Sequence, residues 1–385
     1  MTPAARYQAA IEILDTVLSG VPAEKALTGW ARRSRFAGSK DRAAVRDHVF
    51  ECLRQKRSCT ALGGDESGRG IVLGLIRSKG FETETFFTGI GHAPAELSEA
   101  EKQRGHAPSD AENFDLPDWL IAAFQDSLDA QAGRVAEVLK SRAPTVLRVN
   151  TRKGSIAEAQ AQLTSDGVTT QPLSISPTAL EATEGARRVS GGQAYRDGLV
   201  ELQDGASQAL VDALPLEAGM RVLDYCAGGG GKTLAMAALQ RAQYFAHDAH
   251  AQRLRDLPER ALRAGINVRV LDDPKSEGTF DLVLCDAPCS GAGSWRRSPE
   301  AKWLLTPEKL DELRALQTEI LDKAQSLVSP EGTLAYATCS VLKAENQDQV
   351  DSFLQRHPSW KVAQQNHWLP DAQGDGFFLT CFTKN

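Results

Sequence analysis

Two cysteines stand in sequence settings that could support covalent chemistry. Cys289 lies in LCDAPCSGAG and Cys339 lies in YATCSV, and each follows a short apolar run typical of a strand. A thiolate can attack a substrate and later leave it, provided that its pKa is lowered or that substrate binding removes the proton. Pro288 predicts a rigid turn that directs its neighbours toward one pocket. Zinc binding is the alternative, but no CxxC pair or histidine spacing supports a metal site.

The remaining cysteines give no sign of a disulfide scaffold. The chain has seven cysteines in 385 residues, an odd number at low density, which indicates reduced thiols. We interpret four of them as small buried apolar residues, namely Cys52, Cys59, Cys285 and Cys381.

The loop CAGGGGKT at residues 226–233 predicts a cofactor site. A P-loop ATPase requires glycine six residues before its lysine, where this chain has Cys226, although Asp286 could nominally hold the magnesium ion. A dinucleotide fingerprint is matched only loosely by four consecutive glycines. S-adenosylmethionine fits better, because it is a sulfonium cation without phosphates that close backbone approach and carboxylates can hold. The predicted contacts are Cys226, Ala227, Gly228, Gly229, Gly230, Gly231 and Lys232.

Acidic residues recur where the predicted strands end. From Met220 onward, short apolar strands alternate with helical segments, which is typical of a doubly wound parallel α/β sheet that binds ligands at the carboxyl ends of its strands. Asp248 follows Lys232 by 16 residues, where a ribose-binding acid belongs. Each acid taken alone could instead be a helix N-cap or a turn residue. The strand-end acids that together suit a cationic cofactor are Asp224, Asp248, Asp273 and Asp286.

Three regions of different texture follow one another along the chain. Residues 1–142 carry apolar positions at helical spacing, with a polar, acidic surface connection expected between Glu96 and Glu112. Residues 143–204 mix short strand-like and helix-like runs and predict a small α+β module. Residues 205–385 predict the doubly wound α/β domain, which closes with a hairpin near Gly374.

The charge distribution points to a confined nucleic-acid surface. The net charge of −6 argues against a protein that simply coats nucleic acid, yet residues 1–60 hold eleven Lys and Arg against six Asp and Glu. A solvated helical face is the alternative explanation of such a run. The basic clusters are Arg32, Arg33 and Arg35, and then Arg54, Lys56 and Arg57.

The chain shows neither a membrane span nor a secretory signal. No apolar run approaches about 18 residues, and the N-terminal residues lack the charged-then-apolar layout of a signal peptide. We therefore expect a protein that works in the cytosol without membrane contact. We also expect it to be a monomer.

A methyl donor beside a reactive thiol suits the methylation of carbon 5 of cytosine. That carbon is a poor nucleophile until a thiolate adds to carbon 6, after which carbon 5 takes the methyl group and loses its proton. The base must be unpaired or extruded from a helix. Strand-end placement alone leaves either Cys289 or Cys339 as the nucleophile.

At these residues the sequence resembles the Sun (Fmu-like) family of RNA cytosine-5 methyltransferases, the group that contains ribosomal small-subunit methyltransferase B. The resemblance covers the C-terminal half of the chain. It rests on five segments in order: LQDGASQ, VLDYCAGGGGK, DAPCSGAGSWRRSPEAKW, ATCSVLKAEN and DGFF. It implies a Rossmann-like class I methyltransferase domain.

The resemblance also divides the roles of the site residues. It implies that Cys339 is the nucleophile, that Cys289 assists breakdown of the covalent adduct, and that Asp286 contacts both cofactor and flipped cytosine. It assigns cofactor contacts to the glycine loop and to Asp248, Asp273 and Asp286. It further implies a NusB-type RNA-binding domain in residues 1–142 and an RNA-recognition-like module after it, with ribosomal RNA, or else tRNA, as the substrate. A DNA cytosine methyltransferase, which would use the cysteine after the fourth strand, and an RNA-binding assembly factor without catalysis are the competing hypotheses.

Two further expectations concern loops near the site. The family loop is commonly CAAPGGK, so that Gly228 and Gly229 add backbone freedom here and predict a less preorganised loop. The segment after the catalytic turn interleaves basic and aromatic residues and predicts phosphate contact with base stacking, with core packing of Trp303 as the alternative. These residues are Ser294, Trp295, Arg296, Arg297, Ser298, Lys302 and Trp303.

Overall fold

The computed structural model describes residues 1–385, which fold as two compact units. The helical unit contains residues 1–125, 129–142 and 295–305, and the sheet unit contains residues 126–128, 143–294 and 306–385. No helix combines the length and the apolar character needed to cross a membrane. Segment 295–305 therefore belongs to the helical unit although it directly follows the Cys289 turn in sequence.

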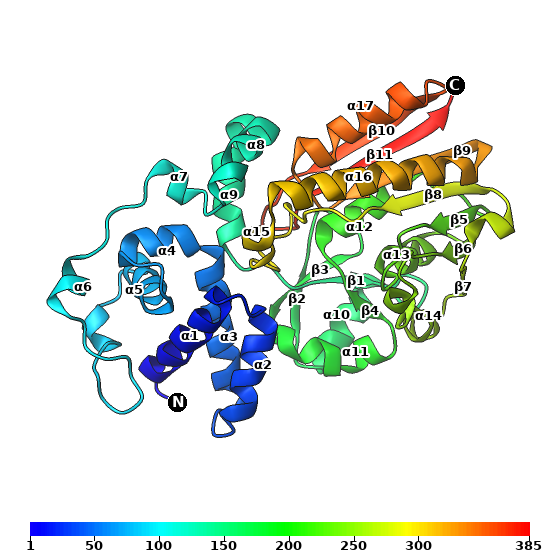
Figure 1. The fold of residues 1–385 in the computed structure, drawn as a ribbon. Helices are drawn as coiled ribbons and strands as arrows, with labels where there is room; N and C mark the ends of the chain where they lie inside the picture. The colour runs from blue at the N-terminus through cyan, green and yellow to red at the C-terminus, as the bar shows by residue number, and fades with distance from the viewer. The chain divides into compact units, whose positions relative to one another are not determined.

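The first 142 residues form helices, as expected (Figure 1). The stretch between Glu96 and Glu112 contains two short helices, each with a serine–glutamate capping box at its start. The helical run after Leu116 is broken at Asp129, whose φ of 45° ends one helix before the next begins. The bounds are α1 Pro3–Leu18, α2 Ala23–Arg33, α3 Ser39–Arg54, α4 Lys56–Gly63, α5 Gly68–Ser78, α6 Glu99–Gln103, α7 Asp110–Asn113, α8 Asp118–Leu128 and α9 Ala132–Lys140.

The break between α3 and α4 is satisfied by side chains distant in sequence. Asp115 accepts hydrogen bonds from the backbone N–H groups of Arg57 and Ser58, at 2.8 and 3.0 Å, and so caps the start of α4. At the end of α3, Lys302 Nζ donates to the carbonyl of Arg54 and Trp303 Nε1 donates to that of Leu53, each at 2.7 Å. Carbonyls at a helix end have no intrahelical partners, so that these donors complete the helix.

This arrangement corrects part of the RNA-contact prediction for residues 294–303. Arg296 is 1% exposed and Lys302 2% exposed, and Arg54 Nε donates to the Arg296 carbonyl at 2.7 Å. Arg54, counted above in a basic cluster, is itself buried. Local sequence suggested solvent-facing cations, but Lys302 turns inward to the Arg54 carbonyl at the end of α3, and the Arg54 side chain turns inward to the Arg296 carbonyl.

The sheet unit contains a small antiparallel module followed by a larger sheet. The module has strand order β2-β3-β1-β4 and one helix long enough to cover it, which confirms the expected α+β fold. Its apolar core includes Leu147, Leu163 and Leu180. The bounds are β1 Val146–Val149, α10 Ile156–Ser165, β2 Thr169–Pro172, β3 Ala179–Glu184, α11 Gln193–Arg196 and β4 Val200–Leu202.

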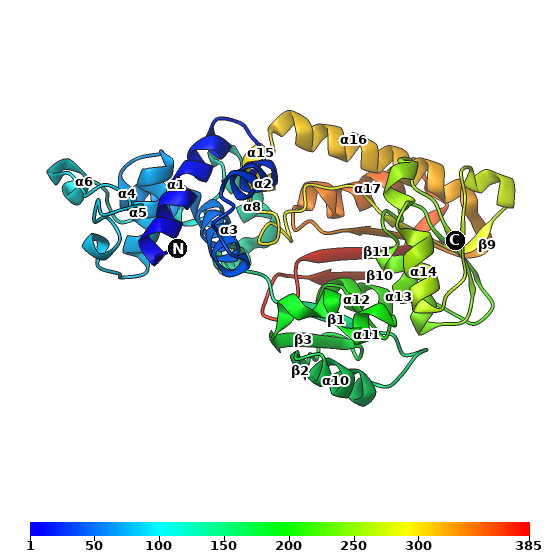
Figure 2. The ribbon, with the colours of Figure 1, turned by 90° about the horizontal axis from the view of Figure 1, so that it is seen from below.

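The larger sheet has the order β10-β11-β9-β8-β5-β6-β7. Strands β9, β8, β5, β6 and β7 are parallel, and the antiparallel pair β10–β11 is the expected closing hairpin. One face packs on α16 and α17 and the other on α12, α13 and α14, which makes the domain doubly wound (Figures 1 and 2). The bounds are α12 Gly205–Asp212, β5 Arg221–Asp224, α13 Gly231–Leu239, β6 Gln243–Ala246, α14 Leu257–Ala264, β7 Val268–Val270, β8 Phe280–Asp286, α15 Ala301–Leu304, α16 Pro307–Ala324, β9 Val328–Thr338, α17 Gln347–Arg356, β10 Trp360–Trp368 and β11 Phe377–Lys384.

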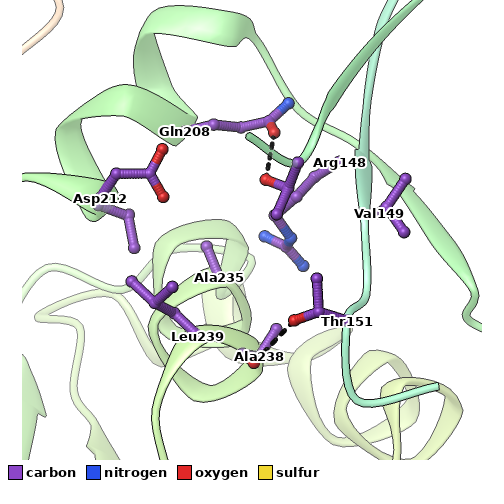
Figure 3. A pocket seen from close by; sticks show the side chains of 10 residues that line it. Arg148, Val149, Thr151, Gln208, Asp212, Ala235, Ala238 and Leu239 are labelled. Carbon is purple, nitrogen blue, oxygen red and sulfur yellow. Dashed lines mark hydrogen bonds between the residues drawn. The ribbon is translucent and has the colours of Figure 1, made fainter. Parts of the chain in front are cut away.

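Polar contacts fasten the small module to the larger sheet. The buried Arg148 of β1 donates to the Gly231 carbonyl at 3.1 Å, and Asn150 Nδ2 donates to the Ala264 carbonyl at 2.9 Å. Figure 3 shows Arg148 at a cavity lined also by Gln208 and Asp212. The cavity measures about 10 Å³, which is room for a single water molecule. The cavity is therefore too small for a cofactor. Arg148 beside it nevertheless contacts the glycine loop, through the Gly231 carbonyl.

Lys302 predicts a specific pH dependence of stability. Burial lowers the pKa of Lys302 from 10.5 to about 7, so that between these values the unfolded chain holds the proton and the folded chain does not. The free energy of unfolding therefore rises with pH across this window. Between pH 7 and pH 9.5, the free energy of unfolding of wild type should rise by at least about 1 kcal/mol more than that of Lys302→Met. Urea denaturation at the two pH values measures this difference. An equal difference between the two proteins at both pH values would contradict this explanation.

Candidate functional site

The site lies where the strand order of the large sheet reverses. The chain proceeds outward from β5 through β6 to β7, and then returns to place β8 on the other side of β5. Loops at the carboxyl ends of two such strands diverge and leave a crevice between them. The segments that follow β5 and β8 are the glycine loop and the Cys289 turn, so that the topology brings together the two motifs singled out from sequence.

The glycine loop needs glycine at two positions in particular. Gly228 has φ of 52° and Gly230 has φ of 78°, a region that other residues rarely adopt. A Cβ at Gly230 would lie 2.2 Å from the side chain of Leu257. The loop closes through the hydrogen bond from Gly230 N to the Ala227 carbonyl at 2.8 Å, and α13 begins at Gly231. Gly228 thus adopts a conformation that the alanine of the commoner family loop would adopt only with strain.

Carboxylates at two strand ends border this loop. Asp248 is buried, accepts from the backbone N–H groups of Gly228 and His250 at 2.9 Å each, and forms an ion pair with Arg253 at 3.0 Å. At the end of β5, Asp224 accepts from Thr233 Oγ1 at 2.6 Å, while its second oxygen is buried without a partner. Burial raises the pKa of Asp224 to about 7.

Asp273 is placed differently from the other acids. Its side chain is exposed and accepts from the Lys275 backbone N–H at 3.0 Å, which caps a short 3₁₀ helix, Pro274–Glu277. Asp273 therefore acts as a helix cap, which is the alternative role that each strand-end acid could have.

The loop and its acids fit a cationic cofactor. One carboxyl oxygen of Asp224 is buried without a hydrogen-bond partner at the end of β5, and Asp248 holds the loop backbone from the next strand end. A positive charge nearby would offset the cost of burying the Asp224 carboxylate. Arg148 supports the same loop through the Gly231 carbonyl. The carboxyl groups of Asp224 and Asp248 would hold the positive charge of S-adenosylmethionine.

Lys232 and Asp286 form an ion pair next to the thiols. Lys232 Nζ lies 2.7 Å from Asp286 Oδ2 and 4.9 Å from the centre of the Phe377 ring. Burial by itself lowers the pKa of Lys232, but Asp286 outweighs it and raises the pKa above its ordinary value. Lys232 therefore stays charged at neutral pH, and it contributes a fixed positive charge to the site.

The structure brings Cys289 and Cys339 together. Their sulfur atoms are 3.4 Å apart, both residues are half-buried, and Ser294 Oγ donates to Cys339 Sγ at 3.8 Å. Donation from the Cys289 thiol lowers the pKa of Cys339, with help from Lys232 and Ser294, although burial and Asp286 oppose it. The same hydrogen bond, together with burial and Glu345, raises the pKa of Cys289. Cys339 is thus the thiol that this geometry favours as a thiolate.

The cysteines that we interpreted as small apolar residues are indeed buried, namely Cys52, Cys59, Cys285 and Cys381. All seven cysteines are free thiols.

Sequence reasoning missed Glu345. This residue is fully buried, and its carboxylate accepts hydrogen bonds from both cysteine turns. It lies in ATCSVLKAEN, six residues after Cys339. The acidic residue nearest in sequence to the Cys339 turn that could bridge to another loop, Glu345, was the available signal.

Known proteins match over most of the chain. A family model described as "16S rRNA methyltransferase RsmB/F" matches residues 211–380, and one described as "Methyltr_RsmF/B-like, ferredoxin-like domain" matches residues 116–187. A curated relative from Yersinia pestis bv. Antiqua (strain Angola), named "Ribosomal RNA small subunit methyltransferase B", is 34% identical over 285 residues. The match covers 70% of this chain and 66% of that relative, just under two thirds of its length.

Two solved structures share the fold. A crystal structure titled PH0851 has a TM-score of 0.77 at 23% identity and covers 100% of this chain and 99% of its own. The structure titled NSun6 from Pyrococcus horikoshii with SFG has a TM-score of 0.62 at 18% identity, and covers 70% and 98% respectively. At such identities the likeness establishes the architecture alone.

The glycine loop supplies a variant that tests cofactor binding. In Gly230→Ala the added methyl group meets Leu257 and the backbone must keep a positive φ, a strain of about 1–3 kcal/mol. We expect the dissociation constant for S-adenosylmethionine, measured by calorimetry, to rise at least about tenfold. Gly133→Ala, a helical position outside the loop where nothing lies within 4 Å of the added Cβ, should bind within about twofold of wild type. Equal affinities of the two variants would show that loop geometry does not control cofactor binding.

Proposed function

Because the chain belongs to the RsmB/F family of methyltransferases, we propose that it methylates carbon 5 of a cytosine in ribosomal RNA. Methyltransferases of this family use S-adenosylmethionine, which supplies an electrophilic methyl group to carbon 5 when bound at the glycine loop. The observation that best supports the proposal is the 3.4 Å approach of two thiols beside Lys232 and Asp286. A ribosomal RNA substrate is also consistent with the cytoplasmic location expected from the sequence.

In the proposed mechanism Cys339 is the nucleophile. Its thiolate forms a bond to carbon 6 of cytosine, and the electrons displaced from the double bond make carbon 5 nucleophilic. After methylation a base removes the proton from carbon 5, the double bond re-forms, and the sulfur leaves with the electrons of its bond to carbon 6. Lys232 and Ser294 stabilise the thiolate before attack and after release.

Cys289 and Asp286 take supporting roles in this proposal. The Cys289 thiol keeps its proton, donates to Cys339, and so lies within reach of the covalent adduct that Cys339 forms, where it assists breakdown. Asp286 ends β8, is partly exposed and is oriented by Lys232, which suits a hydrogen bond to the flipped cytosine. In the same proposal, Cys226 and the other residues of the glycine loop hold the cofactor.

We infer that residues 1–142 form an RNA-binding domain. Within the basic clusters, Arg32, Arg33 and Arg35 are exposed around the end of α2, and Phe36 next to them is 73% exposed. Guanidinium groups contact phosphates, and an exposed aromatic ring stacks on an unpaired base. With a net charge of −6, the chain would confine RNA to such a surface.

The two cysteines should separate into distinct phenotypes. Cys339→Ala should abolish methyl transfer to small-subunit ribosomal RNA, measured with labelled S-adenosylmethionine, because no thiolate can reach carbon 6. Cys289→Ala should instead accumulate protein covalently attached to RNA, seen as a band of reduced mobility on denaturing gels. The Cys381→Ala variant serves as the control, since that thiol is buried in the sheet core.

Near-normal activity of Cys339→Ala would refute this mechanism. A covalent complex formed by Cys339→Ala but not by Cys289→Ala would favour the alternative in which the cysteine after β8 attacks, as a DNA enzyme would use it. Parallel reactions with ribosomal RNA, tRNA and DNA identify the substrate class. Methylation of tRNA or DNA alone would overturn the assignment to ribosomal RNA.

The exposed arginines should contribute to RNA affinity through phosphate contacts. The triple substitution of Arg32, Arg33 and Arg35 by alanine should reduce the dependence of log affinity on log salt by about 0.7 per lost contact with single-stranded RNA. Arg255→Ala, which removes an exposed charge from the sheet unit, should leave that slope unchanged. An unchanged slope in the triple variant would exclude this surface as an RNA contact.

A further inference from the structure

Glu345 connects the two cysteine turns through one carboxylate. It lies at the end of a short 3₁₀ helix, Lys343–Glu345, that follows β9 and the Cys339 turn. Its oxygens accept from the Ser290 backbone N–H at 2.8 Å and from the hydroxyls of Ser290 and Ser340 at 2.5 and 2.6 Å. Ser290 directly follows Cys289, and Ser340 directly follows Cys339. A single side chain thus holds the residue adjacent to each thiol.

Further contacts fix this carboxylate in place. Gln317 of α16 donates to Glu345 at 3.1 Å and also to the carbonyl of Pro288 at 2.9 Å. The Tyr336 hydroxyl donates to the Glu345 carbonyl at 2.7 Å. A buried carboxylate is costly to desolvate unless hydrogen bonds satisfy it. The four donors to this carboxylate are two hydroxyls, a backbone N–H and an amide, all neutral, and they hold the carboxylate beside the Cys289 turn.

We propose that Glu345 is a positioning residue that sets the spacing of the two thiols and, through its charge, keeps the proton on Cys289 rather than on Cys339. The inference rests on the roles proposed above for the two cysteines. It supplies a physical reason for their difference, because the placement of both after adjacent strands does not distinguish them.

The charges around the thiols are arranged asymmetrically. Glu345 acts on Cys289, and its negative charge adds to the donated hydrogen bond and burial in raising the pKa of that thiol. On the other side, Lys232 from α13 and Ser294 favour the Cys339 thiolate, while Asp286 at the end of β8 opposes it. Removal of the Glu345 charge should therefore ease ionisation of Cys289 and leave Cys339 less favoured.

Two substitutions separate charge from geometry. Glu345→Gln keeps an oxygen that accepts from Ser290 N and places an amide between two hydroxyls that can reorient, so it mainly removes the charge. Glu345→Ala removes every contact to both turns. Glu331→Gln removes a charge at an exposed position of β9 and is the matched control.

Thiol alkylation tests the charge effect without RNA or cofactor. Folded protein is treated with iodoacetamide between pH 6 and pH 10, and mass spectrometry of peptides gives a separate rate for Cys289 and for Cys339. In wild type, Cys339 should react at lower pH than Cys289. In Glu345→Gln the ratio of the two rates near pH 7 should fall about tenfold, which corresponds to about one unit in the difference of pKa. The control should keep the wild-type ratio.

Turnover tests the spacing effect. Glu345→Gln should retain covalent attachment to RNA but resolve it more slowly, whereas Glu345→Ala should lose attachment and turnover together while melting as a folded protein. An unchanged alkylation ratio in Glu345→Gln would overturn the charge role. Wild-type attachment in Glu345→Ala would overturn the positioning role. Failure to methylate any RNA would refute the proposed function, while the alkylation ratio would still decide the role of Glu345.

Discussion

The approach of two sulfur atoms to 3.4 Å is the constraint on which the rest of the site depends. Strands β8 and β9 are adjacent and parallel, with Asp286 in register with Ala337, so that the turns after them start from neighbouring positions. Adjacent strands are about 4.8 Å apart, which brings two such turns near each other but does not bring two thiols into contact. The shared carboxylate of Glu345, which accepts from Ser290 in one turn and Ser340 in the other, ties the two turns together.

Only a few charged groups surround the two thiols. The Lys232–Asp286 pair bridges the start of α13 and the end of β8, and it places a fixed cation at the thiols and an oriented carboxylate beside them. The glycine loop that carries Lys232 is supported from the small module by Arg148. That module therefore contributes to the site although none of its residues was predicted to lie there. The acidic residues around the loop suit a cationic cofactor. The two thiols are otherwise similar, and they differ in which of them keeps the proton of the hydrogen bond between them.

The sequence predicted the parts of this site that follow from topology. Strand-end residues converge in a parallel sheet whatever their long-range contacts, and Asp248, Asp286 and Cys339 were found at such ends. Burial of Lys302 could not be predicted, because it depends on the Arg54 carbonyl at the end of α3, 248 residues earlier in the chain. Arg296 depends on the same distant residue, since the Arg54 side chain donates to its carbonyl. Glu345 escaped notice for a similar reason, since its donors come from the Cys289 turn and from α16.

The identity of the attacking sulfur tests the account most directly. RNA that carries 5-fluorocytosine should trap the enzyme after methyl transfer, because fluorine on carbon 5 cannot leave as a proton does. Protease digestion and mass spectrometry of the wild-type complex formed with S-adenosylmethionine would then locate the modified residue. The account predicts attachment of the base to Cys339 alone. Attachment to Cys289, or no covalent complex with any RNA that the enzyme methylates, would contradict it.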